Sequence, residues 1–178
     1  MTEFKVIIGG HSQLSSTFPH IEKAEVSLCR LPGAKLNDFW SHPTFQPMRE
    51  NSHNLAILYL GGNDIFDGCN PRKIISDVVT IAKHLKCLNQ SVVITLLEPR
   101  TYPIDNRFGI HPTTYTRVSN SVNKRLCVLL KKEAIRTINF GARPFQRGHR
   151  QDGVHFNFVT KHFMTLKFRR CIEHHMSL

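Results

Sequence analysis

Short apolar or β-branched segments alternate along this chain with longer segments whose apolar residues recur at helical spacing. The short segments predict five strands, at residues 4–9, 24–31, 55–60, 91–97 and 134–140. Most are apolar on both faces, and helical segments lie between them in sequence. The pattern therefore predicts an α/β fold, in which helices cover both faces of a parallel sheet.

Three segments have the 3.6-residue periodicity of a helix. The first starts at Pro71, with Asn70 as the expected N-cap and Pro71 in the first turn. The second has an apolar stripe from Tyr115 to Leu129, and its polar face carries four basic residues, Arg117, Lys124, Arg125 and Lys132. The third, residues 157–174, is less cleanly amphipathic.

The length of 178 residues fits one domain, residues 1–178, and 40% apolar residues suffice for a core. The longest apolar stretch, Leu55 to Leu60, is far too short to span a bilayer. The first residues, Met1 to Lys5, lack the features of a signal peptide. We therefore expect an intracellular protein, cytoplasmic or nuclear, that is not secreted.

The five cysteines are odd in number and no two are close in sequence, which argues against a disulfide framework and a zinc site. We expect reduced, mostly buried thiols, and no metal or cofactor. The 24 Lys and Arg residues against 13 Asp and Glu give a net charge of +11. This excess favours a polyanionic partner, either nucleic acid or an anionic membrane surface.

Candidate functional residues follow the first three strands. Ser12 comes just after the first strand, Gly33 just after the second and Asn63 just after the third. The carboxyl ends of parallel strands meet at one edge of a sheet, so these residues are expected to lie together. Asp152 and His155 stand three residues apart before the last helix.

Each of these residues has a functional and a structural interpretation. Ser12 could be a nucleophile or a helix N-cap, and Gly33 could offer its N–H to an oxyanion or simply form a turn. Asn63 could donate its side-chain amide to an oxyanion or be a turn residue, with Asp64 bracing its loop. His155 could be a general base oriented by Asp152, or both could belong to a loop and a helix start.

Together, Gly10-His11-Ser12, Gly33, Gly62-Asn63-Asp64 and Asp152 to His155 resemble the four sequence blocks of the SGNH hydrolases, also called GDSL-type esterases and lipases. The resemblance implies a three-layer α/β/α sandwich with a flavodoxin-like, five-stranded parallel sheet. It also implies Ser12 as nucleophile, His155 as base and Asp152 as its partner. The oxyanion hole would consist of the N–H groups of Ser12 and Gly33 and the Asn63 side chain.

His11 departs from the family pattern, which has an aspartate before the serine. That aspartate organises the loop and is not part of the triad, so His11 and Asp64 are expected to have loop-organising roles. The Gly-His-Ser variant also resembles the esterase-like domains of animal retroelements of the LINE type. Such proteins work beside nucleic acid, which would fit the basic charge.

The leading expectation is therefore a serine esterase that hydrolyses a short-chain carboxylic ester, such as an acetyl ester, through an acyl-serine intermediate. The compact length leaves little room for a lid or a deep lipid tunnel. The alternative is a binding module, because some domains that resemble this family lack the catalytic residues and bind RNA. A weaker alternative is attachment to anionic membranes.

Overall fold

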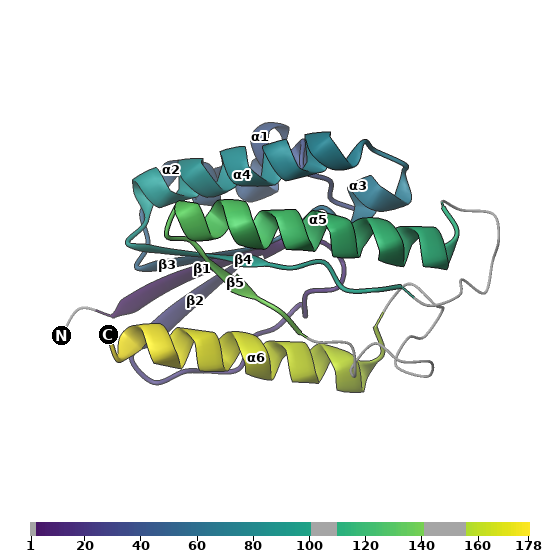
Figure 1. The fold of residues 1–178 in the computed structure, drawn as a ribbon. Coiled ribbons are helices and arrows are strands. Elements are labelled where there is room, and N and C mark those ends of the chain that lie inside the picture. Colours follow the sequence, from purple (N-terminus) through teal and green to yellow (C-terminus); the bar gives the residue numbers. More distant parts are fainter. Residues whose placement is uncertain (1–2, 101–109, 141–155) are drawn as a thin grey trace.

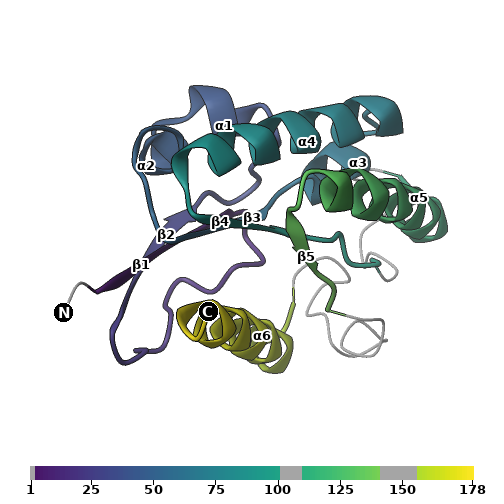
Figure 2. The same ribbon diagram turned by 60° about the vertical axis from the view of Figure 1, so that its left-hand side comes forward.

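A computed structural model describes residues 3–100, 110–140 and 156–178. Five strands form one parallel sheet in the order β2-β1-β3-β4-β5 (Figures 1 and 2). The strands are β1 (Phe4–Gly10), β2 (Ala24–Arg30), β3 (Leu55–Tyr59), β4 (Ser91–Thr95) and β5 (Arg136–Ile138). This is the flavodoxin-like strand order.

Helices cover both faces of this sheet (Figures 1 and 2). On one side lie α1 (Asp38–Ser41), a 3₁₀ turn η1 (Pro43–Phe45), α2 (Gln46–Glu50), α3 (Gly62–Phe66), α4 (Pro71–Leu88) and α5 (Pro112–Lys132). The other side is covered by α6 (Phe158–Met176). The predicted three-layer α/β/α sandwich is confirmed, and α6 is the one described helix of its layer.

Side chains of successive strand residues enter two separate cores, one on each face of the sheet. In β1, Ile7 packs on the side of α4 and α5, whereas Val6 and Ile8 pack on the side of α6. In β3, all five residues are buried. This two-sided burial explains why the central strands are apolar throughout.

The helix ends follow the sequence signals. The predicted N-cap is confirmed, because the Asn70 side chain accepts a hydrogen bond from the Arg72 N–H at 2.8 Å. Asn157 caps α6 in the same way through the Thr160 N–H at 2.9 Å. None of the described helices is long and apolar enough to cross a membrane.

Two predictions need correction. The fifth strand is much shorter than residues 134–140, because Ala134 has a φ of 53° and its N–H closes a turn on the Lys131 carbonyl. The cysteines are all free but mostly not buried: Cys29 alone is fully buried, and Cys87 is exposed.

Candidate active site

The candidate site lies at the carboxyl ends of β1, β2 and β3. In the sheet, Gly10 is paired with Arg30 on one side and with Tyr59 on the other, so the loops that follow these residues leave the sheet together. The Leu31 N–H also donates to the Gly10 carbonyl at 3.0 Å. The clustering of the Ser12, Gly33 and Asn63 loops at one edge is therefore a property of the strand register.

Ser12 lies in a tight turn and is partly exposed. The Leu14 N–H closes the turn on the His11 carbonyl at 3.1 Å. The side chain of Arg30, the last residue of β2, stabilises this turn by donating to the Leu14 carbonyl at 2.9 Å and to the Ser12 carbonyl at 3.4 Å. No helix starts at Ser12, so its interpretation as a helix cap is wrong.

His11 points into the protein and is only 1% exposed. Its ring packs against the Tyr59 ring, with centroids 4.5 Å apart, and its Nδ1 accepts a long hydrogen bond from the Gln13 N–H at 3.4 Å. Its Nε2 lies 3.6 Å from the position that a Cβ on Gly62 would occupy. His11 therefore joins the Ser12 turn to the start of α3, between the candidate nucleophile and Asn63.

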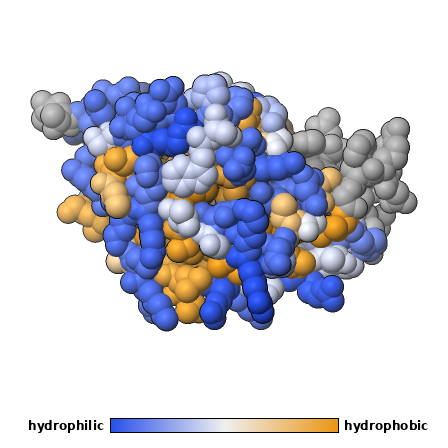
Figure 3. All heavy atoms as spheres, turned by 90° about the horizontal axis from the view of Figure 1, so that it is seen from above, coloured by the Kyte–Doolittle hydropathy of each residue, from blue (hydrophilic) through white to orange (hydrophobic). Residues whose placement is uncertain are grey.

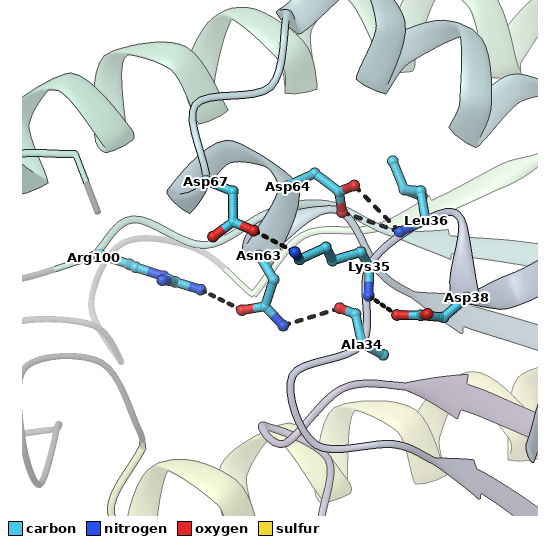
Figure 4. Close-up of polar contacts among 8 residues, drawn as sticks. All are labelled: Ala34, Lys35, Leu36, Asp38, Asn63, Asp64, Asp67 and Arg100. Carbon is cyan, nitrogen blue, oxygen red and sulfur yellow. Dashed lines mark hydrogen bonds and ion pairs between the residues drawn. The ribbon is translucent and has the colours of Figure 1, made fainter. Parts of the chain in front are cut away.

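The Gly33 loop is anchored on both sides of the glycine. Gly33 has a φ of +75°, which favours glycine, and its position is exposed. The next residue, Ala34, donates its N–H to the Leu31 carbonyl at 3.1 Å. The backbone N–H of Lys35 is bound by the Asp38 carboxylate at 2.8 Å (Figure 4).

Asn63 lies in the first turn of α3, which follows Gly61 with its φ of +108°. Its interpretation as a simple turn residue is therefore wrong. The Nδ2 amide donates to the Ala34 carbonyl at 2.9 Å, and Oδ1 accepts from Arg100 at 3.2 Å (Figure 4). The side-chain amide is thus fixed from both ends, directly beside the Gly33 loop.

Two carboxylates add further links between α3 and the Gly33 loop. Asp64, 7% exposed, accepts hydrogen bonds from the Leu36 N–H at 3.1 and 3.3 Å (Figure 4). Burial raises the pKa of Asp64, and these backbone hydrogen bonds oppose the rise. Asp67 forms a 2.5 Å ion pair with Lys35.

Asp152 and His155 lie outside the described residues. The residue that follows His155 does contact the Ser12 turn, because the Phe156 N–H donates to the Gln13 side chain at 2.9 Å. Both residues of this contact are buried, with 2% and 1% exposure. The residue after the candidate base therefore contacts the residue after the candidate nucleophile.

Sequence reasoning missed three residues that shape this edge: Gln13, Arg30 and Arg100. Arg100 was detectable in part, because it lies just after β4 and so at the same edge of the sheet. A buried arginine between aromatic rings has no sequence signature. Among the residues that the structure describes, no cluster of three His, Cys, Asp or Glu side chains could hold a metal ion.

No protein-family model matches this sequence, and no curated protein sequence matches it significantly. Solved structures do match. A GDSL-like lipase from Bacteroides thetaiotaomicron has a TM-score of 0.73 and 15% identity, covering 95% of this chain and 87% of the lipase chain. A member of the lipolytic G-D-S-L family from Veillonella parvula has a TM-score of 0.72 and 18% identity, covering 94% and 97%.

An acetyl xylan esterase also matches, with a TM-score of 0.73, 15% identity, and coverage of 94% of this chain and 99% of the esterase. The similarity extends over nearly the whole length of each partner. The chain therefore has the fold of the GDSL-like hydrolases.

Proposed function

We propose that this protein is a carboxylic-ester hydrolase with Ser12 as its nucleophile. The observation that carries the proposal is the convergence of Ser12, Gly33 and a doubly anchored Asn63 amide at one edge of this fold. A nucleophile needs hydrogen-bond donors already aimed at the charge that develops on the carbonyl oxygen. One N–H bond of the Asn63 amide is used for the Ala34 carbonyl, and we expect the second to donate to the oxyanion.

In the proposed reaction, Ser12 Oγ attacks the ester carbonyl while His155 accepts the hydroxyl proton, and Asp152 orients the imidazole. The N–H groups of Ser12 and Gly33 and the Asn63 amide stabilise the oxyanion. Collapse of the tetrahedral intermediate breaks the ester C–O bond, and His155 returns the proton to the departing alcohol. Water, deprotonated by His155, then attacks the acyl-serine. The second tetrahedral intermediate releases the acid as the bond to Ser12 Oγ breaks, and His155 returns the proton to Ser12 Oγ.

The contact between Gln13 and Phe156 supports the assignment of the base. It holds the chain that follows His155 against the turn that carries Ser12. His11 does not compete for this role, because its ring is buried against Tyr59.

The proposed substrate is an ester of a short acyl group, such as acetate. The chain is small, and one of its structural neighbours is an acetyl xylan esterase of nearly the same extent. Chain-length dependence is therefore a direct test of substrate class. Turnover should be highest for p-nitrophenyl acetate and should fall as the acyl chain lengthens.

The test of the nucleophile compares Ser12→Ala with Ser16→Ala, an exposed serine of the same loop. Ser12→Ala should abolish hydrolysis of p-nitrophenyl acetate and labelling by a fluorophosphonate probe, whereas Ser16→Ala should keep both. A folded wild-type protein that hydrolyses no short-chain ester and takes up no probe would refute the proposal.

A second function, binding of nucleic acid, is favoured by the outer face of α5. This helix contains no acidic residue and exposes five basic ones, Arg117, Lys124, Arg125, Lys131 and Lys132. Arg117, Lys124 and Lys131 are spaced by seven residues, so they share one stripe about 21 Å long. Arg125 also lines a groove between α4 and α5 together with Arg72 and Lys83, on the largely hydrophilic face shown in Figure 3.

If all five cations contact phosphates, log K should fall with log salt at a slope of about −3.5 for single strands and about −4.5 for duplex DNA. Replacing Lys124 and Arg125 together by Glu should make the slope shallower by about 1.4 for single strands and about 1.8 for duplex DNA. Binding should persist in Ser12→Ala. Absence of binding to RNA and DNA at low salt would remove this function, and with it the suggested link to a retroelement protein.

A further inference from the structure

The side-chain amide of Asn63 has one favoured orientation in this structure. Nδ2 faces the Ala34 carbonyl oxygen at 2.9 Å, and Oδ1 faces a guanidinium nitrogen of Arg100 at 3.2 Å. Rotating the amide by 180° would place oxygen against oxygen at Ala34 and N–H against N–H at Arg100. Both contacts would then be repulsive. Ala34 and Arg100 together therefore keep the N–H bonds of the Asn63 amide on the side of the Gly33 loop.

Arg100 is itself held rigidly. It is 6% exposed, and its guanidinium carbon lies 4.5 Å from the Tyr115 ring centroid and 4.9 Å from that of Phe66. These rings come from α5 and α3, so two helices fix the plane of the guanidinium. The Thr116 hydroxyl also donates to the Arg100 carbonyl at 3.4 Å. A planar cation between aromatic faces is a well-defined donor with little freedom to reorient.

The charge of Arg100 also acts on the amide. A cationic donor at Oδ1 withdraws electron density from the amide and makes its N–H groups stronger donors. The same positive charge lies beside the Asn63 amide and favours a negative charge that develops near that amide.

We propose that Arg100 is a positioning residue, which orients and polarises the Asn63 amide as an oxyanion donor. This inference rests on the proposed esterase function. Arg100 acts through Asn63 and need not contact substrate. An oxyanion donor is effective when its orientation is fixed before the substrate binds, and Arg100 fixes the orientation of the Asn63 amide.

The first test is a double-mutant cycle on p-nitrophenyl acetate hydrolysis. Loss of one oxyanion donor costs about 100- to 1,000-fold in kcat, so Asn63→Ala should fall in this range with little change in KM. Arg100→Met should lose a large part of the same factor, and Arg100→Lys should recover some of it. In the Asn63→Ala background, Arg100→Met should cost almost nothing further, since its target is gone.

A merely structural role for Arg100 predicts a different result. Its loss would then lower kcat by the same factor in both backgrounds, and that outcome would overturn the proposal. Unchanged kcat in Arg100→Met would overturn it too. Thermal melting of each variant shows whether it is folded, and Arg170→Met, an exposed arginine on α6, controls for loss of a positive charge.

A second measurement does not depend on activity. The side-chain ¹⁵N–¹H signals of Asn63, identified by their loss in Asn63→Ala, should show two distinct protons in slow exchange with water. In Arg100→Met the chemical shifts of these two protons should move towards those of an amide with no hydrogen-bond partner. If they do not move, Arg100 does not orient Asn63. If the wild type has no esterase activity, the proposed function fails, and these spectra still decide whether Arg100 orients the amide.

Discussion

The substitution Gly10→Ala would test how closely the sheet and the Ser12 turn are fitted together. A Cβ on Gly10 would lie 2.8 Å from the Tyr59 carbonyl oxygen and 2.8 Å from Leu14 Cδ1. The leucine can change its rotamer, but Tyr59 is a backbone partner within the sheet and can move only if the β1–β3 pairing is distorted. Gly10 is therefore required for close approach.

Overpacking of a core costs about 1 to 3 kcal/mol, and a clash with strand backbone belongs in the upper part of this range. For a chain of this size, a loss of about 2 to 3 kcal/mol lowers Tm by about 4 to 12 °C. Thermal unfolding followed by circular dichroism measures this shift. Because the His11–Leu14 turn follows Gly10 directly, a shift of the Gly10 backbone away from Tyr59 would also displace Ser12, and labelling of Ser12 by a fluorophosphonate should be slowed.

The matched control is Gly68→Ala. A Cβ there would meet no atom within 4 Å, but its φ of +76° makes alanine unfavourable by about 1 to 2 kcal/mol. This variant should be destabilised while its Ser12 labelling stays normal. A Gly10→Ala protein that melts within about 1 °C of the wild type would refute the steric argument. If the penalty disappears in a Leu14→Ala background, the clash with Tyr59 is not its cause.

Two further predictions concern titrating groups. Burial lowers the pKa of the His53 side chain in the folded protein below its usual value of about 6.5. As the pH falls below about 6.5, the unfolded chain takes up a proton on His53 that the folded protein does not. The free energy of unfolding therefore decreases until the pH reaches the pKa of His53 in the folded protein. Urea unfolding at about pH 7.5 and about pH 5 should show a smaller loss of stability for His53→Gln than for the wild type; an equal loss would contradict this. Burial also raises the pKa of Cys29 and Cys171 to about 11, whereas Cys87 is exposed, so a thiol reagent should modify Cys87 first in the native protein. The Cys87→Ser variant should lack this fast phase; if the phase persists, another cysteine is responsible.

Most of the architecture could be predicted because its cause is local in the sequence. Central strands are apolar because both faces are covered, and Asn70-Pro71 starts α4 through a side-chain cap. The short helices between residues 38 and 50 had no such signal. They are too short for a visible period and are held by buried side chains such as Phe39 and Met48.

The candidate site was predictable only as far as strand ends determine it. Ser12, Gly33 and Asn63 follow successive strands, and the register brings their loops together. The inward orientation of His11 and the position of Arg100 depend on rings from β3, α3 and α5. Such contacts join distant segments, and neither residue type nor spacing encodes them.

The hydrogen bond between Gln13 and Phe156 joins positions 143 residues apart. The Ser12 turn is made early in translation, but it gains this contact only after Phe156 has left the ribosome. Until α6, which follows Phe156, has also emerged, the face of β1 and β3 that carries Ile8 and Ile57 has no described helix to cover it. A nascent chain would therefore expose an apolar sheet face until α6 packs against it.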